Sequence, residues 1–77
     1  MNEELRQLIL GVYPTAFDFQ CDPEIEQAII CKVPSNTGGW NYLILAKENG
    51  GFRATTRCFM SIQNDSQVAL KSVIFPG

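Results

Sequence analysis

Side chains that commonly carry out catalysis are scarce in this chain. It has no histidine and three cysteines, Cys21, Cys31 and Cys58. A cysteine nucleophile therefore lacks its usual base, and no serine, lysine or tyrosine has a recognisable partner spacing. The cysteines also lack the CxxC spacing of a zinc site or a redox motif. We therefore predict a protein that is not an enzyme and that uses no metal or cofactor.

Four acidic residues form a second group with chemical potential. Asp18, Asp22, Glu24 and Glu26 could gather around a hard cation. The EF-hand pattern of acids with an obligatory glycine is missing, so a solvated acidic loop is the favoured interpretation. Such a loop also offers a surface to a basic patch on a partner, for example a nucleic-acid-binding groove that it would block.

The cysteines and the first residues indicate a compartment. We expect buried free thiols in a reducing cytosol, and a Cys21–Cys31 disulfide across neighbouring strands is the alternative. The opening Met-Asn-Glu-Glu is not the basic start of a secretory signal. No apolar run approaches the roughly 20 residues of a membrane span. The expected protein is soluble, cytoplasmic and independent of membranes.

Charge is divided unevenly along the chain, although the net charge is only −2. Residues 1–31 carry six acidic residues against Arg6 alone, a net charge of −5. Residues 32–77 carry five basic residues against Glu48 and Asp65, a net charge of +3. This division can steer association with a partner. In a small fold it more often reflects pairing between neighbouring elements.

The elements that position these residues begin with a hairpin over residues 40–62. Two runs rich in β-branched and aromatic residues flank Asn49-Gly50, a strong signal for a two-residue type I′ turn. That turn places Lys47 opposite Phe52. A three-residue loop, 49–51, is the alternative, and it would invert the faces of the first strand.

Alternation along the hairpin defines two faces. We expect the core face to hold Leu43 and Leu45 with the even-numbered residues of the second strand, namely Phe52, Ala54, Thr56, Cys58, Met60 and Ile62. The other face holds Tyr42 and Ile44 with Arg53, Thr55, Arg57, Phe59 and Ser61. Aromatic residues and arginines concentrate at interface hot spots, so the second face is a candidate contact surface.

Three interpretations of this second face remain open. A protein partner or a second copy of the chain could cover it, through Tyr42, Arg53, Arg57 and Phe59. Single-stranded nucleic acid could stack on the aromatics, although the acidic net charge disfavours a polyanion. Alternatively, the N-terminal helix or the first strands fold over this face and make it part of the core.

The rest of the chain supplies the packing partners. Residues 2–12 carry Leu5, Leu8, Ile9 and Val12 at helical spacing, so we expect an amphipathic helix that docks its apolar stripe on the sheet. Strands are expected over residues 15–21 and 27–33. Residues 67–75 could form a helix capped by Ser66, but a strand paired with the hairpin keeps the apolar face continuous and is favoured.

Together these elements predict one α+β domain over residues 1–77, with an N-terminal helix followed by about five antiparallel strands in a meander that could curl into a half-barrel. The expected function is non-enzymatic binding to another protein or a protein–nucleic-acid complex, as an inhibitor or adaptor. Compact inhibitors carried by phages, anti-CRISPR proteins among them, share this size and lack of motifs. Binding of single-stranded nucleic acid is the alternative function.

Overall fold

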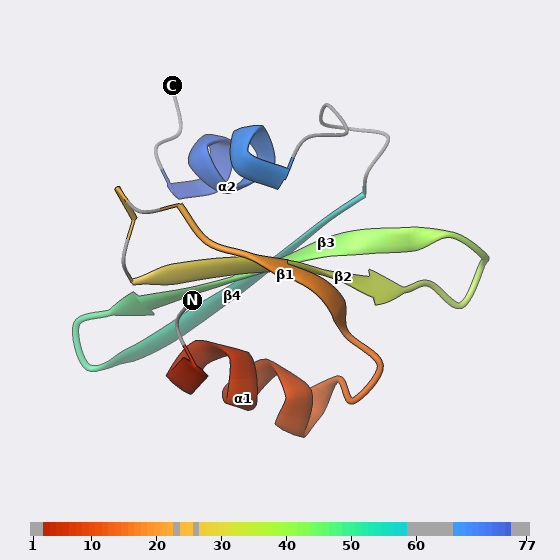
Figure 1. The fold of residues 1–77 in the computed structure, drawn as a ribbon, viewed down its shortest axis with the longest axis horizontal. Coiled ribbons are helices and arrows are strands. Elements are labelled where there is room, and N and C mark those ends of the chain that lie inside the picture. The colour runs from red at the N-terminus through yellow and green to blue at the C-terminus, as the bar shows by residue number, and fades with distance from the viewer. Residues whose placement is uncertain (1–2, 23, 26, 59–65, 75–77) are drawn as a thin grey trace.

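The chain forms three layers, with one helix on each side of an antiparallel sheet (Figure 1). The computed structural model describes residues 3–22, 24–25, 27–58 and 66–74. The four strands follow one another in space in the order β1-β2-β3-β4, and the sheet is not closed into a barrel. The elements are α1 (Glu3–Val12), β1 (Phe17–Gln20), β2 (Ala28–Pro34), β3 (Trp40–Glu48), β4 (Gly51–Cys58) and α2 (Ser66–Ile74).

The hairpin of β3 and β4 has the predicted register. Lys47 lies opposite Phe52 and Leu45 opposite Ala54, as a two-residue turn at Asn49-Gly50 requires. Gly50 has a φ of 81°, a left-handed conformation that glycine adopts without strain. Among the described non-glycine residues only Asp18 has a positive φ, so Asn49 does not. The predicted turn length is therefore correct, but the predicted type I′ geometry is wrong. The three-residue loop is therefore wrong for this chain.

The predicted strand over residues 67–75 is wrong, because this segment is helix α2 (Ser66–Ile74). Its buried apolar residues, Ala69, Leu70 and Val73, recur at helical spacing and pack against the sheet. A strand paired with β4 would have left Tyr42 and Ile44 without cover. The helix covers them, so the sheet has four strands and not five.

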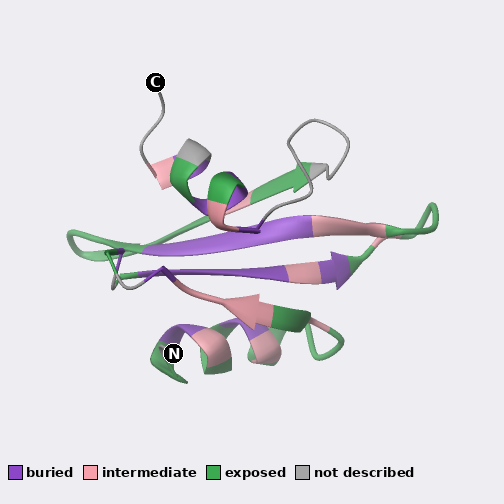
Figure 2. Ribbon diagram, turned by 45° about the horizontal axis from the view of Figure 1, so that its top comes forward, coloured by how far each residue is buried: buried purple, intermediate pink, exposed green. Residues whose placement is uncertain are grey.

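Two separate hydrophobic clusters lie on the two faces of the sheet. Leu5 and Ile9 of α1 pack on odd-numbered residues of the central strands, which are Ile29, Cys31, Val33, Leu43 and Leu45. Helix α2 packs on the even-numbered residues, which are Ala28, Ile30, Tyr42, Ile44 and Ala46, together with Ile25. Strands β2 and β3 are thus buried on both faces, and Figure 2 shows this as continuous purple stretches.

Strand β4 departs from the expected core face. Its alternation was predicted correctly, but Phe52, Ala54 and Thr56 are exposed. A helix is about 10 Å wide and neighbouring strands lie about 4.8 Å apart, so α1 covers the two central strands and does not reach the edge strand. The side chain of Cys58, and Met60 and Ile62, lie outside what the structure describes.

Helix α2 should contribute strongly to stability through one side chain. Leu70 is fully buried, so Leu70→Ala should lower the free energy of unfolding by about 2–5 kcal/mol. Val68, on the same helix, is 42% exposed, and Val68→Ala should change it by less than about 1 kcal/mol. Urea unfolding followed by circular dichroism compares the two. Equal effects would contradict the docking of α2 described above.

Candidate functional site

The predicted contact face is divided by α2. Tyr42 is only 1% exposed, because it packs beneath α2 and edge-on to Trp40 with ring centroids 4.9 Å apart. Its expected role at a surface is therefore corrected to a core role. Arg53 and Arg57 are exposed on β4, as predicted. Phe59 lies outside the described residues. The interpretation that a second layer covers this face is correct for its central part, although the cover is α2 and not the N-terminal helix.

The four predicted acids do not form one surface. Asp18 lies on β1 with a φ of 56° and pairs with Lys32. Asp22 is buried, and its carboxylate lies 3.3 Å from Nζ of Lys71 on α2. Glu24 is exposed, and Glu26 lies outside the described part of the chain. The prediction that Asp22 belongs to an acidic contact surface is therefore wrong.

Asp22 has a structural role in the turn before β2. Its Oδ1 accepts the backbone N–H of Glu24 at 2.8 Å, and its carbonyl accepts the N–H of Ile25 at 2.9 Å. The hydrogen bond from Glu24, together with Lys71, lowers the pKa of Asp22 despite its burial. This carboxylate therefore ties the turn to α2.

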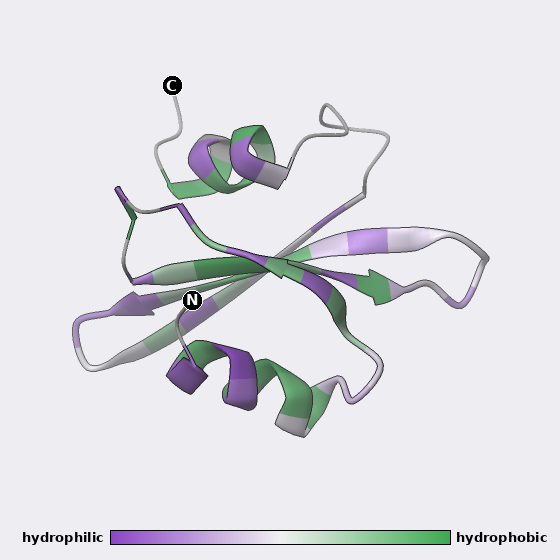
Figure 3. Cartoon of the chain, in the orientation of Figure 1, coloured by the Kyte–Doolittle hydropathy of each residue, from purple (hydrophilic) through white to green (hydrophobic). Residues whose placement is uncertain are grey.

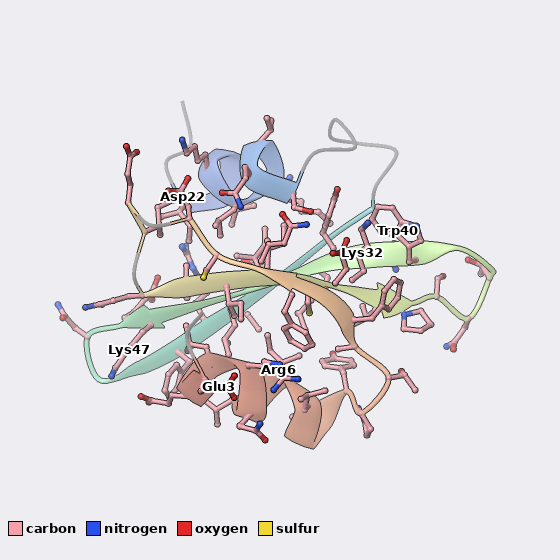
Figure 4. All side chains as sticks on the ribbon, viewed as in Figure 1. Glu3, Arg6, Asp22, Lys32, Trp40 and Lys47 are labelled. Carbon is pink, nitrogen blue, oxygen red and sulfur yellow. The ribbon has the colours of Figure 1, made fainter. Side chains whose placement is uncertain are left out.

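Lys32 joins β1 to β2 and β3. Its Nζ lies 2.7 Å from Oδ2 of Asp18 and 4.6 Å from the centroid of the Trp40 ring. Figure 4 shows Lys32 and Trp40 on the same part of the sheet. The hydrogen bond from Lys32, with a smaller one from Gln20, lowers the pKa of Asp18. The ammonium group of Lys32 and the indole ring of Trp40 therefore interact with each other within the fold.

Cys21 and Cys31 are both free thiols, so the alternative of a disulfide between them is wrong. Burial raises the pKa of Cys31 to about 12. Its thiol is therefore protonated at neutral pH, and it acts as a small apolar group in the cluster under α1.

An apolar groove lies between α1 and the hairpin. Its volume is about 300 Å³, and it is lined by Leu8, Ile9, Val12, Tyr13, Leu43, Leu45, Phe52 and Ala54. Val12 is 71% exposed and Phe52 is 46% exposed, so the walls of this groove are open to solvent. The C-terminal half of α1, which forms one wall, carries mostly hydrophobic residues (Figure 3).

The groove was not predicted, because the whole apolar stripe of α1 was expected to pack on the sheet. Leu5 and Ile9 do so, while Leu8 and Val12 remain exposed beside the groove. One signal was present in the sequence. Four apolar residues on a ten-residue helix form a wide stripe. The two central strands cannot cover all of it, so part of the stripe stays exposed beside the edge strand.

The outer edge of β4 borders this groove. The backbone N–H of Lys47 donates to the carbonyl of Gln27 at 2.8 Å, on the side away from β4. Bonding alternates along an antiparallel pair, so the outward-pointing backbone groups of β4 are those of Phe52, Ala54 and Thr56. Within the described ranges, no strand pairs with this edge.

Comparisons with protein-family models, curated proteins and solved structures found no match to this chain. No described helix is both long and apolar enough to cross a membrane. Among the described residues, no group of three or more acidic or cysteine side chains is arranged to hold a metal ion. The groove and the β4 edge are therefore the features from which a function can be inferred.

The two lowered carboxylate pKa values predict loss of stability in acid. Each carboxylate stabilises the folded state at a pH above 3.8, the pKa of an ordinary aspartate. This contribution is lost as the pH falls through the lower pKa that the carboxylate has in the folded state. Urea unfolding from about pH 6 to about pH 2.5 should show stability falling below about pH 4. Asp18→Asn and Asp22→Asn should each flatten this dependence. A dependence unchanged in both variants would contradict the assigned ion pairs.

Proposed function

We propose that this chain is a non-enzymatic binding protein that acts as an inhibitor or adaptor by placing its groove and β4 edge against another protein. The observation that carries the proposal is the open apolar groove beside the outer edge of β4. Leu8, Val12 and Tyr13 line it from the helix side, and Phe52 lines it from the strand side. Exposed apolar side chains gathered in one place are typical of interaction sites.

Two properties support a macromolecular partner over a small ligand. Val12 and Phe52 on the two walls of the groove are exposed, whereas small-molecule sites enclose most of the ligand surface. Arg53 and Arg57 lie exposed on the same strand, where they can form the polar rim that surrounds the apolar centre of a protein interface.

The alternative of single-stranded nucleic acid has less support. Stacking needs exposed aromatic rings on a basic surface. Tyr42 is buried under α2, and Arg53 pairs with Glu48 at 3.1 Å. The described part of the predicted face therefore offers two arginines and no exposed ring beside them.

Capture experiments with a matched pair of phenylalanine variants test the proposal. Phe52 lines the groove, and Phe17 lies on the opposite edge strand with nearly the same exposure, 42% against 46%. Immobilised wild type, Phe52→Asp and Phe17→Asp are incubated with lysate of the cells that encode the protein. Proteins captured by wild type and Phe17→Asp should be lost, at least about ten-fold, with Phe52→Asp, because a charge would be buried at the contact.

Circular dichroism and thermal unfolding of both variants establish that they remain folded. If wild type retains no protein above the blank matrix, or if the three proteins capture the same set equally, the proposed surface is wrong.

A further inference from the structure

Strand β4 forms one edge of the sheet, and no described strand pairs with its outer side. This strand is eight residues long and regular, whereas the other edge strand, β1, has four residues and an irregular register around Asp18. Short or bulged edges resist pairing with another chain, and long regular edges favour it. The two edges of the sheet therefore differ in their capacity to accept a further strand.

The side chains of β4 present different chemistry to the two sides of that edge. Phe52 and Ala54 point toward the α1 side and line the apolar groove. Arg53 and Arg57 alternate with them and point toward the α2 side. Nζ of Lys47 lies 3.8 Å from a carboxylate oxygen of Glu4, and Glu3 pairs with Arg6 within α1, so neither acid of α1 pairs with this part of β4.

We propose that the partner supplies an extended segment with alternating apolar and acidic side chains, which adds to β4 as a fifth strand. This inference rests on the proposed function and names the class of partner for the same surface. The backbone of the segment bonds to the outward N–H and C=O groups of Phe52, Ala54 and Thr56. Its apolar side chains enter the groove, and its carboxylates lie beside Arg57, while Arg53 keeps Glu48 as its ion-pair partner.

Charge favours this occupant over a second copy of the chain. A second β4 would bring its own Arg57 onto the same face of the extended sheet, whereas Arg53 of each copy is already paired with Glu48. Like charges on neighbouring strands are destabilising. An acidic segment meets Arg57 with the opposite sign.

The test uses capped nine-residue peptides added to the full chain. One peptide alternates glutamate with valine, and a matched one alternates lysine with valine. Amide hydrogen exchange followed by NMR reports on each residue. The glutamate peptide should slow exchange at Phe52, Ala54 and Thr56, while Arg53 and Thr55, whose amides already face β3, should change little. The lysine peptide should bind at least about five-fold more weakly.

Methylated peptides separate strand addition from mere apolar contact. In an antiparallel arrangement the valine N–H groups face β4, and in a parallel arrangement the glutamate N–H groups face it. N-methylation of either the valines or the glutamates, but not of both, should therefore abolish binding. Loss with methylated valines indicates an antiparallel added strand, and loss with methylated glutamates indicates a parallel one. Equal binding by both methylated peptides and the unmodified one would overturn the proposal.

Charge variants test the assigned arginine. Arg57→Gln should weaken the glutamate peptide about two- to five-fold at low salt. Arg6→Gln removes the same charge from α1, where Arg6 stacks over Phe19 of β1, and should leave the affinity unchanged. Equal weakening by both variants would overturn the pairing with β4.

The outcomes also distinguish this inference from the proposed function. Capture that depends on Phe52, with no peptide protection at Ala54, would leave a groove that binds proteins but overturn strand addition. Analytical ultracentrifugation of the chain without peptide measures whether it self-associates. A dimer whose formation protects the Ala54 amide would assign the edge to a second copy and overturn the acidic segment.

Discussion

Burial of the central strands on both faces is the constraint on which the structure depends. Ile29 and Leu43 pack against α1, while Ile30 and Ile44 pack against α2. Each helix is short and would be unstable in isolation, so each depends on the strip of sheet that it covers. The sheet depends equally on the helices, because neither apolar face of β2 and β3 could remain in water.

Ion pairs join the two oppositely charged parts of the chain around this core. Lys32 pairs with Asp18, Lys47 with Glu4, and Lys71 with Asp22, and each pair links residues 1–31 to residues 32–77. The uneven charge distribution therefore reflects ion pairing between neighbouring elements, which was one of its two predicted explanations. Exposed pairs contribute little to stability individually. Asp22 differs because its carboxylate is buried and also orders the turn before β2.

Local signals predicted the elements whose geometry is locally determined. The Asn49-Gly50 turn fixes the hairpin register, and helical spacing identifies α1. The C-terminal helix could not be distinguished from a strand by pattern, because its apolar residues fit either period, and the need to cover Tyr42 is visible only in the folded structure. The open β4 edge and the groove have two different tertiary causes, and neither follows from local sequence signals. The β4 edge is open because residues 66–74 form a helix instead of a fifth strand. The groove is open because only part of the α1 stripe packs on the sheet.

The layer arrangement also explains why the accessible apolar surface lies at β4. Two helices of similar length cover the two central strands, and α1 also contacts β1 through Arg6 and Phe19, whereas β4 remains uncovered. At β1 the exposed edge is short and Asp18 interrupts its register. At β4 the edge is long and regular, and the uncovered half of the α1 stripe lies alongside it. Among the described residues, the β4 side therefore presents strand backbone groups, apolar side chains and arginines together.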